Sequence, residues 1–204
     1  MKTQLSDLQK DALTEIFNIG MGRAANALSQ MANDEITLAV PSLALVSRHE
    51  AVEILAKTAG ERVCSVTQRL AGEFNADAIL IFPESHSLDI VRLMVGDTYP
   101  GSLTEMEEEA LNEIGNIILN ACIGTLVNIL GGEFTISLPV SKIDTCQSIL
   151  ELEKRGHDDV VMLLYIDFLL KSRTIYGHVA ILQDIVSMPN FQNKIEVYLE
   201  SLQR

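Results

Sequence analysis

Residues 11–41 read DALTEIFNIGMGRAANALSQMANDEITLAVP, and residues 109–139 read EALNEIGNIILNACIGTLVNILGGEFTISLP. The two stretches align without a gap at an offset of 98, and ten of the 31 positions are identical. The identical pairs are Ala12/Ala110, Leu13/Leu111, Glu15/Glu113, Ile16/Ile114, Asn18/Asn116, Ile19/Ile117, Leu28/Leu126, Glu35/Glu133, Thr37/Thr135 and Pro41/Pro139. The chain is therefore internally duplicated, and the two copies predict the same local structure.

Each copy predicts a long helix, a short strand, a shorter helix, a strand pair and a closing helix. The expected ranges are 7–32, 35–40, 48–59, 62–71 with 76–82, and 85–96 in the first copy, and 105–130, 133–138, 144–154, 159–170 with 173–182, and 189–202 in the second. This order predicts an α/β (α+β) fold with pseudo-twofold symmetry, in which one largely antiparallel sheet is crossed by two long helices. Residues 97–102 are too short a linker to separate independent domains. We therefore expect a single domain, 1–204, built from two repeats at about 1–98 and 99–204.

The two long helices have matching start signals. Ser6 with Gln9, and Thr104 with Glu107, fit capping boxes, in which side chains satisfy the first backbone N–H groups of a helix. Both signals occur in the register that aligns the identities, which supports the duplication.

A polar stripe runs along each long helix, because residues at i, i+4, i+7 and i+11 share one face. The stripe consists of Asp11, Glu15, Asn18 and Gly22 in the first copy, and of Glu109, Glu113, Asn116 and Asn120 in the second. It lies away from the apolar stripe, so we expect it to face solvent. The glutamates alone would fit an ordinary solvated face, but asparagine and glycine are poor helix formers. Asn18 beside Gly20 and Gly22 therefore indicates a surface that a partner approaches closely.

The composition excludes several classes of function. The net charge is −13 and the Lys and Arg residues are scattered, so nucleic-acid binding is not expected. Cys64, Cys122 and Cys146 form no C-x-x-C pair, which argues against a metal site or a disulfide framework and favours buried thiols. Residues 1–10 do not fit a signal peptide. The apolar stretch 160–170 contains Asp167 and is much shorter than the about 20 residues of a membrane span, so we expect a cytoplasmic protein without membrane insertion.

The pattern D-x-x-x-E-x-x-N, followed by 22 residues and a proline, occurs in the first copy, and the second copy has the same spacing with Glu in place of the Asp. Its members are Asp11, Glu15, Asn18 and Pro41 in the first copy, and Glu109, Glu113, Asn116 and Pro139 in the second. We expect each proline to end the short strand, because it lacks an N–H group for the ladder. Together with the strings NIGMGRAA at 18–25 and LTEME at 103–107, this pattern resembles the CheC family of chemotaxis phosphatases, which are relatives of CheX and of the flagellar switch protein FliY. The resemblance covers essentially the whole chain.

The resemblance implies a phosphatase that hydrolyses the aspartyl phosphate of CheY, a chemotaxis response regulator. Asn18 and Asn116 would orient the attacking water, and Glu15 and Glu113 would pair with a lysine of CheY. The Mg²⁺ would be held by CheY, so the chain is expected to have no cofactor of its own. A monomer is sufficient, since one chain supplies two sites.

The second copy departs from the family pattern. Glu109 stands where the family usually has Asp or Ser, which keeps the acidity. Ile118 and Asn120 replace the two glycines of the first copy, so the first copy is expected to be the main working site. A further family partner, CheD, would dock on the helix expected at 144–154 with Asp144 as a contact. Asp144 fits the helix N-cap equally well.

Two other functions remain open at this point. The chain could be a non-catalytic scaffold or flagellar switch component, or a module that sequesters phosphorylated CheY. The Glu/Asn pairs, which FliM-type relatives lack, favour the enzyme, and so does the absence of the C-terminal switch domain that FliY-type relatives carry. The sequence does not identify which CheY homologue is the target.

Overall fold

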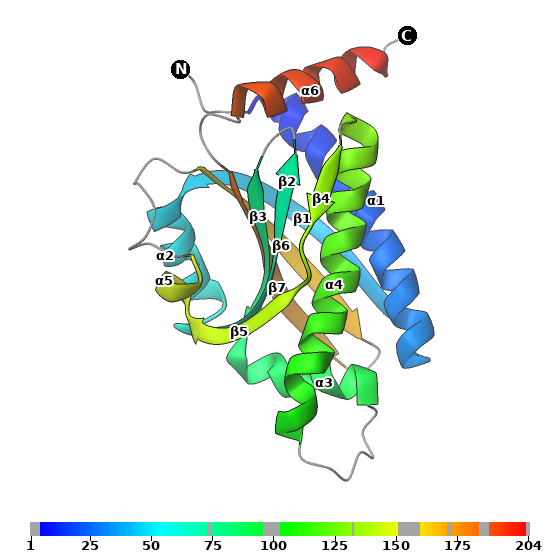
Figure 1. Ribbon diagram of the computed structural model, residues 1–204, viewed down its shortest axis with the longest axis vertical. Coiled ribbons are helices and arrows are strands. Elements are labelled where there is room, and N and C mark those ends of the chain that lie inside the picture. The colour runs from blue at the N-terminus through cyan, green and yellow to red at the C-terminus, as the bar shows by residue number, and fades with distance from the viewer. Residues whose placement is uncertain are drawn as a thin grey trace.

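A seven-stranded sheet runs through the molecule, with two long helices side by side on one face and two short helices on the other (Figure 1). The computed structural model describes residues 5–72, 75–95, 103–131, 133–150, 160–170, 173–183 and 188–202. The helices are α1 (Asp7–Ala32), α2 (Arg48–Thr58), the 3-10 turn η1 (Glu84–His86), α3 (Ser87–Val95), α4 (Leu103–Leu130), α5 (Cys146–Ile149) and α6 (Met188–Ser201). The strands are β1 (Ile36–Ser47), β2 (Arg62–Gly72), β3 (Ala76–Pro83), β4 (Phe134–Ile136), β5 (Val140–Thr145), β6 (Val160–Leu170) and β7 (Arg173–Gln183).

The strand order is β1-β6-β7-β3-β2-β4, with β5 also paired to β2, and every pair is antiparallel. An offset of 98 maps β2 onto β6, β3 onto β7, and β1 onto β4 and β5 together. Read from either edge, the sheet therefore has the same order of equivalent strands, as expected for a pseudo-twofold repeat. The predicted fold class is confirmed. The two repeats exchange strands. β1 of the first repeat pairs with β6 of the second, and β4 and β5 of the second pair with β2 of the first.

The prediction that the prolines end their strands is wrong for Pro41. β1 continues to Ser47, and its register against β6 shifts between Ala39 and Ser42, so Val40 and Pro41 form a bulge. β4 and β5 lie in line along β2 on either side of a break at 137–139, which includes Pro139. Both prolines are tolerated because they lie in irregular segments of the two edge strands, where no ladder hydrogen bond is required.

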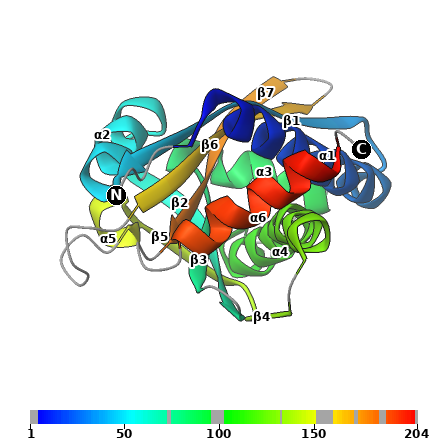
Figure 2. The same ribbon diagram turned by 90° about the horizontal axis from the view of Figure 1, so that it is seen from above.

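Two apolar layers cover the faces of the sheet. Beneath α1 and α4, buried side chains such as Phe17 and Ile114 pack against Val66 and Phe168 of the strands. A second, smaller layer lies beneath α2 and α5. Seen from above, α6 lies over one end of the α1–α4 pair (Figure 2). The long helices are thus fixed from below by the sheet and at one end by α6.

The boundaries predicted for the long helices and for the strand pairs agree with the structure to within a few residues. The capping box at Ser6 and Gln9 is present, with backbone-to-side-chain distances of 3.2 and 2.9 Å, whereas the side chain of Thr104 lies outside the described residues. The helix predicted at 144–154 is shorter: α5 covers Cys146–Ile149, and residues 151–159 lie outside the described part of the chain.

Among the described residues, one helical segment, Glu107–Leu130, is long and apolar enough by composition alone to cross a membrane. The fold gives these apolar residues another partner. They belong to α4, which packs against α1, α3 and the sheet. The segment is apolar because it is a core helix.

Candidate functional site

The predicted site residues lie on the outer side of the two long helices, one set on each helix. On α1, Asp11 and Glu15 are exposed and Asn18 is half-buried; the equivalent residues of α4 have the same exposure. In the described part of the chain, neither Glu15 nor Glu113 has a hydrogen bond or ion pair through its carboxylate. Both carboxylates can therefore accept an external cation. The expected solvent-facing stripe holds for the acidic residues and only partly for the asparagines.

The carboxamide of Asn18 is bound to the backbone of the β1 bulge. The Val40 N–H donates to Asn18 Oδ1 at 2.8 Å, and Asn18 Nδ2 donates to the Val40 carbonyl at 3.2 Å. Val40 is left out of the ladder with β6 by the register shift, so the side-chain amide takes the place of the missing strand partner. In the first copy, this contact ties the asparagine to the residue before the proline. One N–H and one oxygen lone pair of Asn18 remain available to other groups.

The carboxamide of Asn116 is held differently. Its Oδ1 accepts from Asn120 Nδ2 at 2.7 Å and from Gln68 Nε2 at 3.1 Å. Gln68 belongs to β2 and is buried, and its Nε2 also lies 3.4 Å from Asn120 Oδ1 and from the Ser137 carbonyl. The two site asparagines are therefore both immobilised, one by backbone and the other by side chains.

Gln68 was not predicted as a site residue. The offset that defines the repeat pairs it with Ile166, so a polar residue replaces an apolar one at equivalent strand positions. That mismatch was visible in the sequence. The role of Gln68 was not visible, because it depends on a tertiary contact between β2 and α4.

The two glycines of α1 have different roles. Gly20 is buried, and a Cβ there would lie 2.9 Å from both the Ala121 carbonyl oxygen and Cys122 Cα of α4. The expectation that Gly20 keeps an outer surface open is therefore wrong; it permits close contact between the two helices. Gly22 is exposed, and a Cβ added there would have no heavy atom of a neighbouring element within 4 Å, which agrees with the predicted open surface.

Asp144 is engaged within its own segment. Its carboxylate accepts hydrogen bonds from Lys142, from the Ser148 hydroxyl and from the Thr145 N–H, and these hold the pKa of Asp144 well below its usual range. The N-cap of α5 is Thr145, whose hydroxyl accepts from the Ser148 N–H, so the interpretation of Asp144 as the N-cap is wrong. The contact with CheD stays a prediction.

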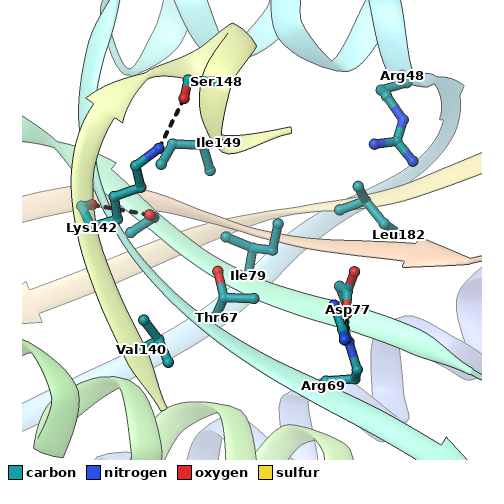
Figure 3. Close-up of a pocket in the computed structure, with 11 residues that line it drawn as sticks. Arg48, Thr67, Arg69, Asp77, Ile79, Val140, Lys142, Ser148, Ile149 and Leu182 are labelled. Atoms are coloured by element: carbon teal, nitrogen blue, oxygen red, sulfur yellow. Dashed lines mark hydrogen bonds and ion pairs between the residues drawn. The ribbon is translucent and has the colours of Figure 1, made fainter. Parts of the chain in front are cut away.

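A pocket of about 230 Å³ lies on the sheet face that carries α2 and α5 (Figure 3). Three cationic side chains line it, although the chain is acidic overall. Each of them has an interaction partner within the chain. Arg69 pairs with Asp77, Lys142 with Asp144, and Arg48 donates to the Leu150 carbonyl. The charges of the pocket are thus largely balanced from within.

The thiols and the acidic residues form no reactive cluster in the described part of the chain. All three cysteines are buried, as expected, and burial raises the pKa of Cys64 and Cys122 to about 12. Within the described ranges, no three His, Cys, Asp or Glu side chains are grouped as a metal site would require.

Comparisons with known proteins show which families this fold and its paired Glu-x-x-Asn helices are similar to. Residues 8–45 match the model of the CheC-like family. Over 167 residues the chain is 26% identical to the CheY-P phosphatase CheC of Bacillus subtilis (strain 168), covering 78% of this chain and 79% of that protein. It is also 26% identical to the flagellar motor switch phosphatase FliY of the same organism over 174 residues, which cover 82% of this chain and 43% of that relative. The predicted resemblance to the CheC family is confirmed.

Solved structures show the same fold. FliY of Thermotoga maritima has a TM-score of 0.73 at 18% identity, covering 97% of this chain and 98% of that one. A CheX–CheY–BeF3–Mg complex from Borrelia burgdorferi has a TM-score of 0.52 at 19% identity, covering 81% and 96%.

Proposed function

We propose that this chain is a phosphatase that hydrolyses the aspartyl phosphate of a phosphorylated CheY-type response regulator. The observation that carries the proposal is the repeated pairing of an exposed glutamate with an immobilised asparagine, one turn apart, on the outer face of each long helix. Similarity to a named CheY-P phosphatase supports it. The likeness of the fold to CheX, whose solved complex contains CheY, is consistent with it.

The proposed chemistry asks little covalent work of the protein. An acyl phosphate is already activated, and its hydrolysis needs mainly a water held in line with the scissile bond. Asn18 and Asn116 would orient that water through their amides, and the hydrogen bonds of each amide reduce the entropy lost when it does so. The regulator would contribute the Mg²⁺ that neutralises the phosphate.

Glu15 and Glu113 would dock the regulator. Each lies three residues before its asparagine, on the same helix face, and has no cationic partner among the described residues. A lysine beside the phosphorylated aspartate would pair with the glutamate and thereby place the asparagine against the phosphoryl group. One chain would act as a monomer with two sites, in the cytoplasm.

Decay of phosphorylated CheY, measured with and without the chain, tests this function. We expect the chain to accelerate decay, and we expect the double variant Asn18→Ala with Asn116→Ala to lose the acceleration. The matched control is Asn26→Ala with Asn128→Ala, which removes one exposed amide from each of the same two helices. The proposal fails if the Asn18/Asn116 variant, shown to be folded by circular dichroism, still accelerates decay as the control does.

A scaffold is the second candidate, and the fold gives it a specific basis. The FliM middle domain of H. pylori has the same fold, with a TM-score of 0.66 at 9% identity. A scaffold would bind phosphorylated CheY without changing its decay, so the same assay combined with a binding measurement separates the two functions.

A further inference from the structure

We infer that Gln68 is a positioning residue of the second site, which holds the Asn116 carboxamide by its oxygen and directs its NH₂ group outward. The inference rests on the proposed function and deepens it, because it makes the two sites chemically different. Its basis is the Gln68–Asn120–Asn116 cluster, in which two amide nitrogens converge on one oxygen, at 3.1 and 2.7 Å.

The planar amide of Asn116 has a fixed orientation. Oδ1 of Asn116 has two lone pairs, and Gln68 and Asn120 donate to it together. In a planar carboxamide the NH₂ group has a fixed direction relative to the oxygen, so holding the oxygen in place also sets the direction of the N–H donors. The second site therefore presents N–H donors, whereas Asn18, bound through both its oxygen and its nitrogen to Val40, keeps one donor and one acceptor.

Gln68 is a poor choice of residue for stability alone. It is 1% exposed, and its Oε1 is buried without a hydrogen-bond partner among the described residues. An unsatisfied buried acceptor is destabilising. The equivalent position on β6, opposite the β1 bulge, is occupied by the fully buried Ile166, so the same fold accepts an apolar side chain there. A residue that is unfavourable for folding and contacts a site asparagine is best explained by what it does to that asparagine.

The test isolates the second site in the Asn18→Ala chain and adds Gln68→Ile, the residue that the fold already uses at the equivalent position. We expect kcat for CheY-P decay to fall roughly tenfold, because the Asn116 amide loses its orientation, while KM changes less than about twofold. The unfolding midpoint should stay equal or rise, since the unsatisfied acceptor is removed.

The matched control is Ser65→Ala in the same background. Ser65 is buried on the same strand and donates to the Lys142 carbonyl at 3.1 Å, but it faces the pocket on the opposite side of the sheet. Ser65→Ala should leave kcat unchanged.

Gln68→Glu supplies a second readout, because a protonated carboxyl can donate to Asn116 Oδ1 and a carboxylate cannot. The kcat of this variant, relative to its parent at each pH, should therefore recover as pH falls.

A measurement independent of activity is the side-chain NH₂ resonances in the NMR spectrum. Gln68→Ile should shift those of Asn116 and leave those of Asn18 in place. If the unmodified chain does not accelerate CheY-P decay, the proposed function fails, and these resonances alone decide whether Gln68 holds Asn116.

Three results would overturn the inference while the proposed function stands. One is an unchanged kcat in the Asn18→Ala/Gln68→Ile chain. Another is an equal loss when Gln68→Ile is placed in the Asn116→Ala chain, which would show a general structural effect. The third is an active parent chain whose Asn18→Ala variant has no activity at all.

Discussion

Asn18 combines two tasks in one side chain. Its amide satisfies the backbone of a buried residue in the β1 bulge, and the same amide is the group proposed to orient water. The polar stripe of the helix indicated Asn18 as a site residue, because asparagine is unfavourable at mid-helix. The bond to Val40 could not be predicted, because it depends on where a strand 22 residues away bulges.

The two site asparagines should therefore differ in their effect on stability. Asn18→Ala leaves the N–H and carbonyl of buried Val40 unpaired, so we expect the free energy of unfolding to fall by about 1–3 kcal/mol. Asn116→Ala removes an acceptor shared by side chains, but Gln68 Nε2 can still donate to the Ser137 carbonyl. The free energy of unfolding should therefore fall less for Asn116→Ala than for Asn18→Ala. Urea unfolding of the two single variants measures the difference. Equal losses would contradict the anchoring role of Asn18.

His178 of β7 should make stability depend on pH. It is buried beside Tyr165 and Thr58, and burial lowers its pKa from 6.5 to about 4. The unfolded chain therefore takes up a proton at a higher pH than the folded chain. The contribution to stability is complete above pH 6.5 and is lost as pH falls toward 4, by up to roughly 3 kcal/mol. Urea unfolding at pH 7 and pH 5 should show that the free energy of unfolding falls less in His178→Gln than in the unmodified chain. An equal fall in the two proteins would refute this role of His178.

At the scale of elements, the long helices and the strand pairs were predictable because apolar periodicity and capping are local properties. The path of the edge strands was not. Proline reads as a strand end from sequence alone, yet β1 passes through Pro41 because an edge strand can bulge. Likewise, Gly20 and Gly22 look alike in the sequence and differ only in whether another helix lies above them.

Alanine substitutions at these two glycines should have opposite effects. At Gly20 a Cβ would meet backbone atoms of α4, so the helices must separate, and we expect a loss of about 1–3 kcal/mol. At Gly22 the site is open, and alanine should stabilise the helix by about 0.5–1 kcal/mol. Thermal unfolding of both variants provides the measurement. Two changes of the same sign would show that the α1–α4 contact is not as close as described.

At the scale of the whole molecule, the main feature is the exchange of strands between the two repeats. The internal offset predicted two similar halves and one shared sheet, but not which strands would pair. β1 lies at an edge and has β6 of the other repeat as its strand partner. We therefore propose that the chain is a single cooperative domain in which neither repeat completes its own sheet.

Separate fragments test this interdependence. Residues 1–98 and 99–204, each produced alone, should lack a cooperative unfolding transition, because the edge strands have no partner within the fragment. Mixing the fragments should restore a cooperative transition, followed by circular dichroism. A cooperative transition in either fragment alone would contradict the proposal.

The same pairing constrains when the chain can fold during synthesis. Each paired residue of β1 meets its β6 partner more than a hundred residues later in the chain. The long first helix and its edge strand must therefore wait, with apolar surface uncovered, until most of the polypeptide has left the ribosome. Contacts this distant in sequence slow folding and prolong exposure to aggregation. The duplicated architecture that supplies two sites also makes the early part of the chain dependent on protection until the late part arrives.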